Sequence, residues 1–242
     1  MVPSGLDPAR ERQHHPLLEM FLAAARGNFP PVDGGVTFLP SLPDGNRAVV
    51  AFTGHAVVAS PWTADQLRWL EPDGFGGAMD PRVLLEVARA GGDVAATSDD
   101  RSRLGAIGVH DVTMVATGIP HGVDDPLEPT DRFDEHPRVV HARHLRRNVT
   151  VLAGDAGFVT LAEGLAGRPE ISVELLEPGV RPGDGRDLIG RARQHVPAGS
   201  PLFAAVSPGN ARSLRAFLAA GFVPIGSEVI VDMAGSKARD AS

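Results

Sequence analysis

The sequence predicts an α/β fold in which a mixed, mostly antiparallel sheet is flanked by helices. Short runs rich in Val, Ile and Phe alternate with segments of helical spacing along the 242 residues, and Gly, Pro and Asp separate them. In the second half, three strand-like runs come in succession and are followed by helix, strand, helix and strand. The length suits one large domain or two small ones, and both remain open.

The first half is predicted to contain helices and short strands. The apolar segment from His15 to Gly27 is short and charged, which favours an amphipathic helix over a signal peptide. The runs "GGVTFLP", "NRAVVAFTG" and "HAVVAS" predict a small meander. Thr63 with Gln66, and Asp80 with Pro81, are residue types that begin helices. A further strand is predicted at "VHDVTMVATG".

A segment rich in Pro and Asp, from Ile119 to Pro137, has no apolar periodicity and is interpreted as a linker. We therefore expect an N-terminal α/β region over residues 1–130 and a second domain over residues 131–242. A degenerate second copy of the C-terminal fold is an open alternative for the first region, because its order of strands and helices is loosely compatible.

Three antiparallel strands are predicted between Asn148 and Gly179, where β-rich runs alternate with turns that contain Gly. The segment "RDLIGRARQHV" then has helical spacing, and "PLFAAVS" is a strand. Asn210 precedes a helix from Ala211 to Ala220, and Gly221 ends it where a left-handed residue is wanted. Phe222 then folds back as a hydrophobic stop before a final strand.

These features together resemble the GCN5-related N-acetyltransferase (GNAT) superfamily. Members of that family have a strand, a Gly-x-Gly turn at a helix start, a second strand, an Asn-led helix and Gly-Phe before a last strand. The resemblance extends from about Arg138 to Asp232. It implies a GNAT-like fold, acetyl-CoA or another acyl-CoA as co-substrate, and an amine as acceptor.

The resemblance places the acyl-CoA pyrophosphate on the turn "VRPGDG", because a helix N-terminus offers unpaired N–H groups and a positive dipole. Gly183 and Gly185 occupy the two glycine positions of the motif. Val180 departs from the Arg or Gln of the family, although two neighbouring arginines could supply charge. The cofactor residues expected in this turn are Arg181, Pro182, Gly183, Asp184, Gly185 and Arg186.

The strand "EISVELLEPG" is expected to splay from its neighbour, as the corresponding family strand does, and to bind the pantetheine arm. Its cofactor contacts would come from Val173, Leu175 and Leu176. Glu170 and Glu174 lie on one face of the strand, and family members often use a Glu as base. Glu174 is the first catalytic candidate and Glu170 the second. The alternative is that both are solvent-facing strand carboxylates.

The chain contains no Tyr, so the Tyr that often protonates the departing thiolate in the family is missing. Phe217 occupies its place and is expected at the cofactor. Ser213, a His or water would have to replace the acid, unless the thiolate leaves unassisted. Asn210 is expected to contact the cofactor as its family counterpart does, or to be a simple N-cap.

Two histidine-containing segments raise the question of a metal or catalytic site. His136 to Val149 contains three His and four Arg. His141 and His144 could meet on one helix face, but no third ligand lies at a suitable spacing, so we predict no metal site. The segment is interpreted as an anion-facing or solvated one. His55 is interpreted as a turn residue satisfied by backbone hydrogen bonds.

The composition excludes several classes of protein. A formal net charge of −7 argues against a broadly basic nucleic-acid surface. No apolar run approaches the roughly 18 residues of a membrane span. The absence of Cys excludes disulfides and thiolate sites and fits a cytoplasmic location. Few Lys among many Ala, Gly and Arg suggest a bacterial source.

The sequence therefore predicts an N-acetyltransferase that acts on a small-molecule or peptide amine, with the first half shaping the acceptor pocket. A non-catalytic acyl-CoA-binding or regulatory protein is the main alternative, because the Tyr and the motif's Arg or Gln are missing. A structural or dimerising protein that keeps only the fold is a third. A homodimer remains open.

Overall fold

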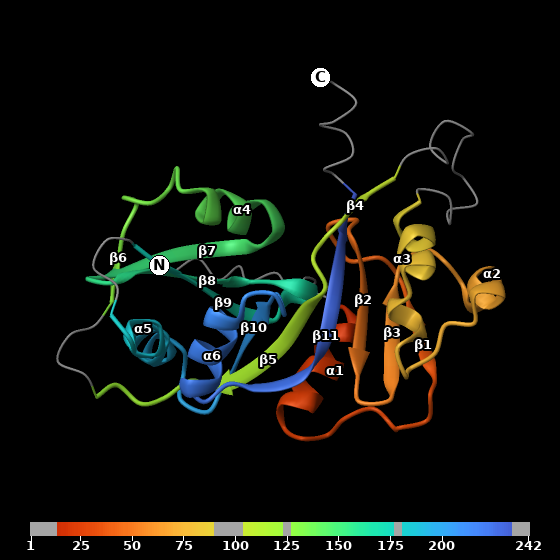
Figure 1. Cartoon of the computed structure of the whole chain (residues 1–242), viewed down its shortest axis with the longest axis horizontal. Coiled ribbons are helices and arrows are strands. Elements are labelled where there is room, and N and C mark those ends of the chain that lie inside the picture. The colour runs from red at the N-terminus through yellow and green to blue at the C-terminus, as the bar shows by residue number, and fades with distance from the viewer. Residues whose placement is uncertain (1–13, 90–103, 123–126, 177–180, 234–242) are drawn as a thin grey trace, which may run out of the picture.

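The computed structural model describes residues 14–89, 104–122, 127–176 and 181–233. The strands form one eleven-stranded sheet with the order β1-β3-β2-β11-β5-β10-β9-β8-β7-β6, and β4 pairs with β11 beside that path. Figure 1 shows this sheet running through the whole molecule, with helices packed against it. The fold is thus the predicted α/β fold, with a large, mostly antiparallel sheet flanked by helices.

In its described residues, the first half supplies the strands at one side of the sheet, one strand at its centre and three α-helices. The helices are short, and 3₁₀ turns follow or precede two of them. The elements are α1 (Pro16–Ala25), β1 (Val36–Leu39), β2 (Arg47–Phe52), β3 (His55–Ala59), α2 (Ala64–Leu67), η1 (Arg68–Leu70), η2 (Gly77–Met79), α3 (Pro81–Ala88), β4 (Ala106–Ile107) and β5 (Asp111–Thr117).

The second half follows the predicted order of three strands, helix, strand, helix and strand. It also contains a short strand and a helix before them. The elements are β6 (Glu128–Pro129), α4 (Pro137–Leu145), β7 (Arg147–Gly154), β8 (Gly157–Glu163), η4 (Leu165–Gly167), β9 (Pro169–Leu175), α5 (Asp184–Ala192), η5 (Arg193–His195), β10 (Pro201–Val206), α6 (Ala211–Ala219) and β11 (Val223–Asp232).

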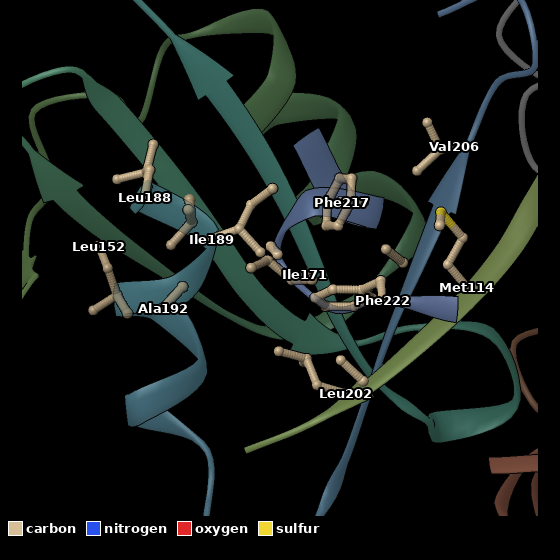
Figure 2. Close-up of a cluster of buried hydrophobic side chains, with 14 of the residues drawn as sticks. Met114, Leu152, Ile171, Leu188, Ile189, Ala192, Leu202, Val206, Phe217 and Phe222 are labelled. Carbon is tan, nitrogen blue, oxygen red and sulfur yellow. The ribbon is translucent and has the colours of Figure 1, made fainter. Parts of the chain in front are cut away.

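Helices cover both faces of the sheet. On one face, α1 packs over β2, β3 and β10, while α4 packs over β7 and β8. On the other, α3 packs over β2, β3 and β11, while α5 and α6 pack over β5, β8, β9 and β10. Figure 2 shows the last of these cores, in which Phe217 and Phe222 lie among the aliphatic side chains of α5 and the sheet. Successive side chains of a strand point to opposite faces of the sheet, so a strand can contribute side chains to the cores on both faces.

The two halves of the chain share the centre of the sheet. Strand β5, from the first half, lies between β10 and β11 and is antiparallel to both. Strand β11, from the end of the chain, in turn pairs with β2. In Figure 1 the blue β11 runs between the yellow-green β5 and the orange β2. The domain boundary at residue 130 stays a prediction. Two domains divided there would share one sheet, because β5 of the first would lie between β10 and β11 of the second.

The predicted meander differs from the structure at its first strand. β2 and β3 form the expected hairpin through Gly54, whose φ of +70° suits a tight turn. β1, however, pairs with β3 in parallel. The reason is that the connection from β1 to β2 spans residues 40–46, which is long enough to return the chain to the far side of the hairpin.

The predicted linker also contains packed structure. Within its described part, Leu127 is buried in the core beneath α5, and β6 pairs with β7. The segment therefore crosses the edge of the sheet and brings the chain to α4. His136, the N-cap of α4, accepts a hydrogen bond from the backbone N–H of Arg138, which fixes where that helix begins.

Candidate functional site

The parallel strands β9 and β10 separate next to the centre of the sheet. They pair at a single position, Glu170 with Phe203, whereas β9 pairs with β8 along its whole length. Beyond Glu170, the edge of β9 that faces β10 therefore has no partner strand among the residues that the structure describes. Such an edge presents backbone N–H and C=O groups that an extended ligand can bind. This is the strand that the sequence predicted to splay.

Helix α5 begins beside this gap. Its N-cap is Gly183, with a φ of +105°, a conformation that other residues adopt only with strain. A Cβ atom at Gly183 would meet only the guanidinium of Arg186, at 3.9 Å, so the turn is open to solvent. At the start of α5 the N–H of Asp184 donates to the carbonyl oxygen of Arg181 at 3.2 Å, and the next N–H groups of a first helical turn have no partner within the helix.

An open groove of about 510 Å³ surrounds the start of α5, and we call it the arginine groove. Its floor is formed by Leu175 of β9 and Ala216 and Ala219 of α6. Four arginines line it, Arg181, Arg186, Arg212 and Arg215. In a chain with a net charge of −7, this concentration of guanidinium groups beside a helix N-terminus makes a local anion-binding surface.

Two carboxylates reduce the positive charge of the arginine groove. Asp184 accepts a hydrogen bond from the backbone N–H of Arg181 at 2.6 Å, so it braces the turn. Asp187 accepts one from Nε of Arg186 at 3.0 Å. Both acidic residues also lie in the first turn of α5, where the helix dipole stabilises them. An anion bound here would have to share Arg186 with Asp187.

Gly185 has a packing role in addition to the one predicted for it. A Cβ atom there would lie 3.3 Å from Cβ of Ala216 and 3.5 Å from a methyl group of Leu175. The absence of a side chain thus lets the first turn of α5 approach α6 and β9 closely. This contact holds the turn of Gly183 against the end of the splayed strand.

A second groove, of about 250 Å³, lies along the gap, and we call it the strand-gap groove. Val173, Glu174 and Leu175 of β9 form one side of it, and Asn210 and Ser213 of α6 form another. It shares Leu175, Gly185, Arg212 and Ala216 with the arginine groove, so the two are continuous. Ten of the predicted site residues therefore line one connected surface that extends from Gly183 to Ser213.

The catalytic candidates have different surroundings. Glu174 is 30% exposed in the strand-gap groove and forms an ion pair with Arg138 of α4. Glu170 is 3% exposed and is held by Arg146 and Arg168. Burial alone would raise the pKa of Glu170, but the two guanidinium groups hold it below its ordinary value. This geometry favours a structural ion pair for Glu170, and its catalytic role stays a prediction.

Three other predicted residues have structural contacts of their own. Asn210 accepts a hydrogen bond from the backbone N–H of Ser213 at 3.0 Å, so it is an N-cap as well as a groove residue. Phe217 is 3% exposed and packs edge-on against Phe222, inside the core drawn in Figure 2. Leu176 packs with Phe133 and Phe158, on the α4 side of the sheet.

The sequence analysis missed a buried charge network beside the gap. Arg168, with no exposed side-chain surface, donates two hydrogen bonds of 2.7 Å to Glu228 of β11 and others to Glu170. Thr113 of β5 donates to Glu228 at 2.6 Å. No motif marks these residues, because they come from three strands far apart in the sequence. A charged residue in an otherwise apolar strand, such as Glu228, was the available signal.

The basic segment of α4 faces carboxylates. Arg138 pairs with Glu174, and Arg146 pairs with Glu170 at 2.5 Å. The other two arginines also form ion pairs, Arg143 with Asp134 and Arg147 with Glu163. His144 contacts Asp232 at 2.6 Å. The arginines of the segment are thus paired with carboxylates of the sheet and, for Arg143, with Asp134 just before α4, which differs from a purely solvated surface.

His55 is satisfied by side chains instead of the predicted backbone groups. Its Nδ1 contacts Asp33 at 2.8 Å, and its Nε2 contacts the hydroxyl of Thr37 at 2.9 Å. The hydrogen bond to His55 holds the pKa of Asp33 below its ordinary value. These contacts tie β1 to β3 and support their parallel pairing.

Comparison with known proteins gives a limited likeness. No family model and no curated protein matches the chain. A solved structure from Novosphingobium aromaticivorans, assigned to the GNAT family of acetyltransferases, has 15% identity and a TM-score of 0.36, over 52% of this chain and 64% of its own. A GNAT-family acetyltransferase from Colwellia psychrerythraea has 9% identity and a TM-score of 0.33, over 54% and 58%. The chain thus spans less than two thirds of either structure.

Both structures are named for the family that the sequence resembles, but likenesses this distant carry nothing about activity. Within the described ranges, no group of three or more His, Asp or Glu is arranged to hold a metal ion. The same residues include no helix with the length and apolar character needed to cross a membrane.

Proposed function

We propose that this protein is an N-acyltransferase that transfers the acyl group of acetyl-CoA, or of another acyl-CoA, to an amine. The observation that carries the proposal is the continuity of the arginine groove with the unpaired edge of β9. Acyl-CoA is a long ligand with phosphates at one end and amide groups in its arm. A cationic helix N-terminus that leads into an open strand edge offers complementary chemistry in the same order.

Residues of this chain fit such a donor. Arg181 and Arg186, with the backbone of Gly183 and the N–H groups of α5, would hold the phosphates. The backbone of Val173 to Leu175 would hold the arm, because no strand in the described part of the chain pairs with that edge beyond Glu170. Asp184 weakens the fit, because its carboxylate adds negative charge and accepts a hydrogen bond from the backbone N–H of Arg181. The four arginines that line the groove outnumber this carboxylate.

A bound acyl-CoA supplies an activated thioester carbonyl. In the reaction, the amine nitrogen bonds to the acyl carbon, the carbon–sulfur bond breaks, and the amine's proton balances the thiol that leaves. Glu174 is the carboxylate in the strand-gap groove and would accept that proton once Arg138 moves aside. Ser213, in the same groove, is a hydroxyl that could donate to the leaving sulfur. Phe217 is buried and has no proton to give.

The first test is calorimetric titration of the protein with acetyl-CoA and with free coenzyme A. Gly183→Glu should abolish binding, because it places a side chain and a negative charge against the phosphates. Gly27→Glu is the matched control. Gly27 also has a positive φ, nothing lies within 4 Å of its Cβ position, and it lines neither of the two grooves. Equal binding by a folded Gly183→Glu protein would refute the donor site.

Catalysis is tested separately by thiol release from acetyl-CoA in the presence of a panel of amines. Glu174→Gln should lower the rate by about 100-fold or more while sparing donor affinity, which is the size of effect that a general base has. A rate equal to that of the wild type would remove Glu174 as the base.

A donor-binding protein without turnover is the second candidate. It is favoured by the absence of Tyr from the chain and by the burial of Phe217 at the position where the family often has its acid. Binding of acetyl-CoA without thiol release, for any amine in the panel, would select it over the transferase.

A further inference from the structure

A pocket of about 210 Å³ lies on the α4 side of the sheet, at the point where β9 and β10 still pair. We call it the α4 pocket. Its walls come from α4, β5, β9, β10 and β11, and part of them is apolar, including Leu145, Leu165 and Ile230. The volume is below the range usual for drug-sized ligands, which indicates a small one. The charged and polar residues around it are Asp111, His141, Arg146, Glu170 and Glu228.

The charges around the α4 pocket do not balance. Glu170 is paired with Arg146 and Arg168, and Glu228 with Arg168 and the hydroxyl of Thr113. Asp111, which lies opposite Glu228 on β5, has no hydrogen bond or ion pair to its carboxylate among the described residues. Three carboxylates, from Asp111, Glu170 and Glu228, therefore face two guanidinium groups, from Arg146 and Arg168. Among the described residues, Asp111 is the carboxylate of the three without an ion pair, and it lines the pocket.

The protonation states follow from these surroundings. Burial, and then the charges of Glu228 and Glu170, raise the pKa of Asp111 to about 6, against the opposing effect of Arg146 and Arg168. Burial, and then Arg146, lower the pKa of His141. At neutral pH the pocket therefore holds an anionic Asp111 and a neutral imidazole, which gives it a net affinity for a cation.

The pocket adjoins the proposed donor site. Glu170 lines the α4 pocket, and Val173 lines the strand-gap groove three residues further along β9, roughly 10 Å away. On α4, His141 faces the pocket and Arg138, one helical turn earlier, faces the groove. A small molecule in the pocket would thus approach the gap from the face opposite α5 and α6.

We propose that the α4 pocket binds the acceptor as a small organic cation, a primary amine with an apolar body, and that Asp111 is its counter-ion. This inference rests on the proposed function for the identity of the ligand as acceptor. An ammonium group supplies the one positive charge that the pocket lacks, and the apolar wall accommodates the hydrocarbon part. Asp111 is a recognition residue that would hold the ammonium form before the reaction. The base predicted at Glu174 would accept the proton after the nitrogen leaves Asp111 for the strand-gap groove.

The test is calorimetric titration, without acyl-CoA, of n-butylamine and 2-phenylethylamine against the alcohols n-butanol and 2-phenylethanol. At pH 8 the wild type should prefer at least one amine over its alcohol by about tenfold, the effect of one favourable ion pair of about 1.4 kcal/mol. Asp111→Asn should remove the preference. Asp155→Asn, at an exposed carboxylate in the β7–β8 turn, should keep it.

Lowering the pH provides a second test that needs no variant. Below about pH 6 Asp111 takes up a proton, and a protonated His141 would add repulsion, while Glu170 stays charged because its pKa is low. The preference for the amine should therefore fall several-fold between pH 8 and pH 5. A preference that is absent at pH 8, or that is the same in Asp111→Asn and in the wild type, would overturn the proposal.

Titration of the same proteins with acetyl-CoA separates the two proposals. Donor binding together with no amine preference would refute the α4 pocket alone. Amine preference that depends on Asp111, together with no donor binding, would refute the transferase and leave the pocket as a cation site.

Discussion

At the scale of single residues, Arg168 does most to connect the site to the fold. Its guanidinium lies over the rings of Phe21 and Phe203, with distances of 4.4 and 5.4 Å to their centroids, and binds Glu170 and Glu228. Burial alone would lower the pKa of Arg168, but the two carboxylates raise it, so it stays charged. It thereby joins β9, β10 and β11 where the strands begin to separate.

Arg168→Met should destabilise the protein by about 3–5 kcal/mol, because it removes the charge that compensates two buried carboxylates. Urea unfolding at pH 7 measures the loss. Arg147→Met is the control, since its side chain is 67% exposed and 3.7 Å from Glu163, and it should cost less than about 1 kcal/mol. Equal effects of the two substitutions would show that the network contributes little.

The same network predicts how stability depends on pH. The pKa of Glu170 is lower in the folded protein than its ordinary value of 4.5, so the unfolded chain binds the proton more readily. The stabilisation is therefore complete above about pH 4.5 and is lost as the pH falls through the folded pKa. Unfolding free energies measured from pH 7 down to pH 3 should fall less steeply in Glu170→Gln.

At the scale of elements, the position of α5 decides whether the arginine groove exists. The helix is tied to α6 by the contact at Gly185 and to the sheet by Leu188 and Ile189, which are buried in the core. Its first turn thus stands beside the free edge of β9. A shift of this helix would separate its N–H groups from the strand edge along which we propose that the donor binds.

Two glycines of α5 provide a matched pair of substitutions. Gly185→Val should cost about 1–3 kcal/mol through overpacking against Ala216 and should weaken acetyl-CoA binding. Gly190→Ala should stabilise the protein by about 0.5–1 kcal/mol and leave binding unchanged, because nothing lies within 4 Å of its Cβ position. Thermal unfolding and calorimetry measure both. Unchanged stability in Gly185→Val would contradict the close contact of α5 with α6.

At the scale of the whole molecule, strand exchange makes the halves interdependent. Removing residues 131–242 would take β10 and β11 from both sides of β5, and removing residues 1–130 would leave a gap between them. The α4 pocket likewise uses Asp111 from the first half and Glu228 from the second. The expectation that the first half shapes an acceptor site stays a prediction, and it depends on the proposal made for this pocket.

Unfolding in urea should consequently be one cooperative transition. The two tryptophans, Trp62 and Trp69, lie in the first half, so their fluorescence reports on that half, whereas far-ultraviolet circular dichroism reports on the whole chain. The two signals should give the same midpoint. A fluorescence midpoint at lower urea than the dichroism midpoint would instead support independent domains over residues 1–130 and 131–242.

The sequence by itself determined the local structure. Caps at Asp80 and Asn210, the turn at Gly183 and the apolar spacing of "RDLIGRARQHV" each act within a few residues, and the corresponding elements form where they were predicted. The order of elements in the second half follows from the same short-range signals. The candidate residues of the two grooves were predicted from the family resemblance, which depends on the order and spacing of these elements.

Only the tertiary structure decided which distant elements meet. The pairing of β1 with β3, the insertion of β5 between β10 and β11, and the network around Arg168 join residues that are distant in the sequence. Thr113 and Glu228, for example, are separated by 115 positions. No local pattern encodes these contacts, because each strand's alternation is compatible with many partners. Burial of both sheet faces and pairing of the enclosed charges select one arrangement, and that selection brings Asp111 into the α4 pocket.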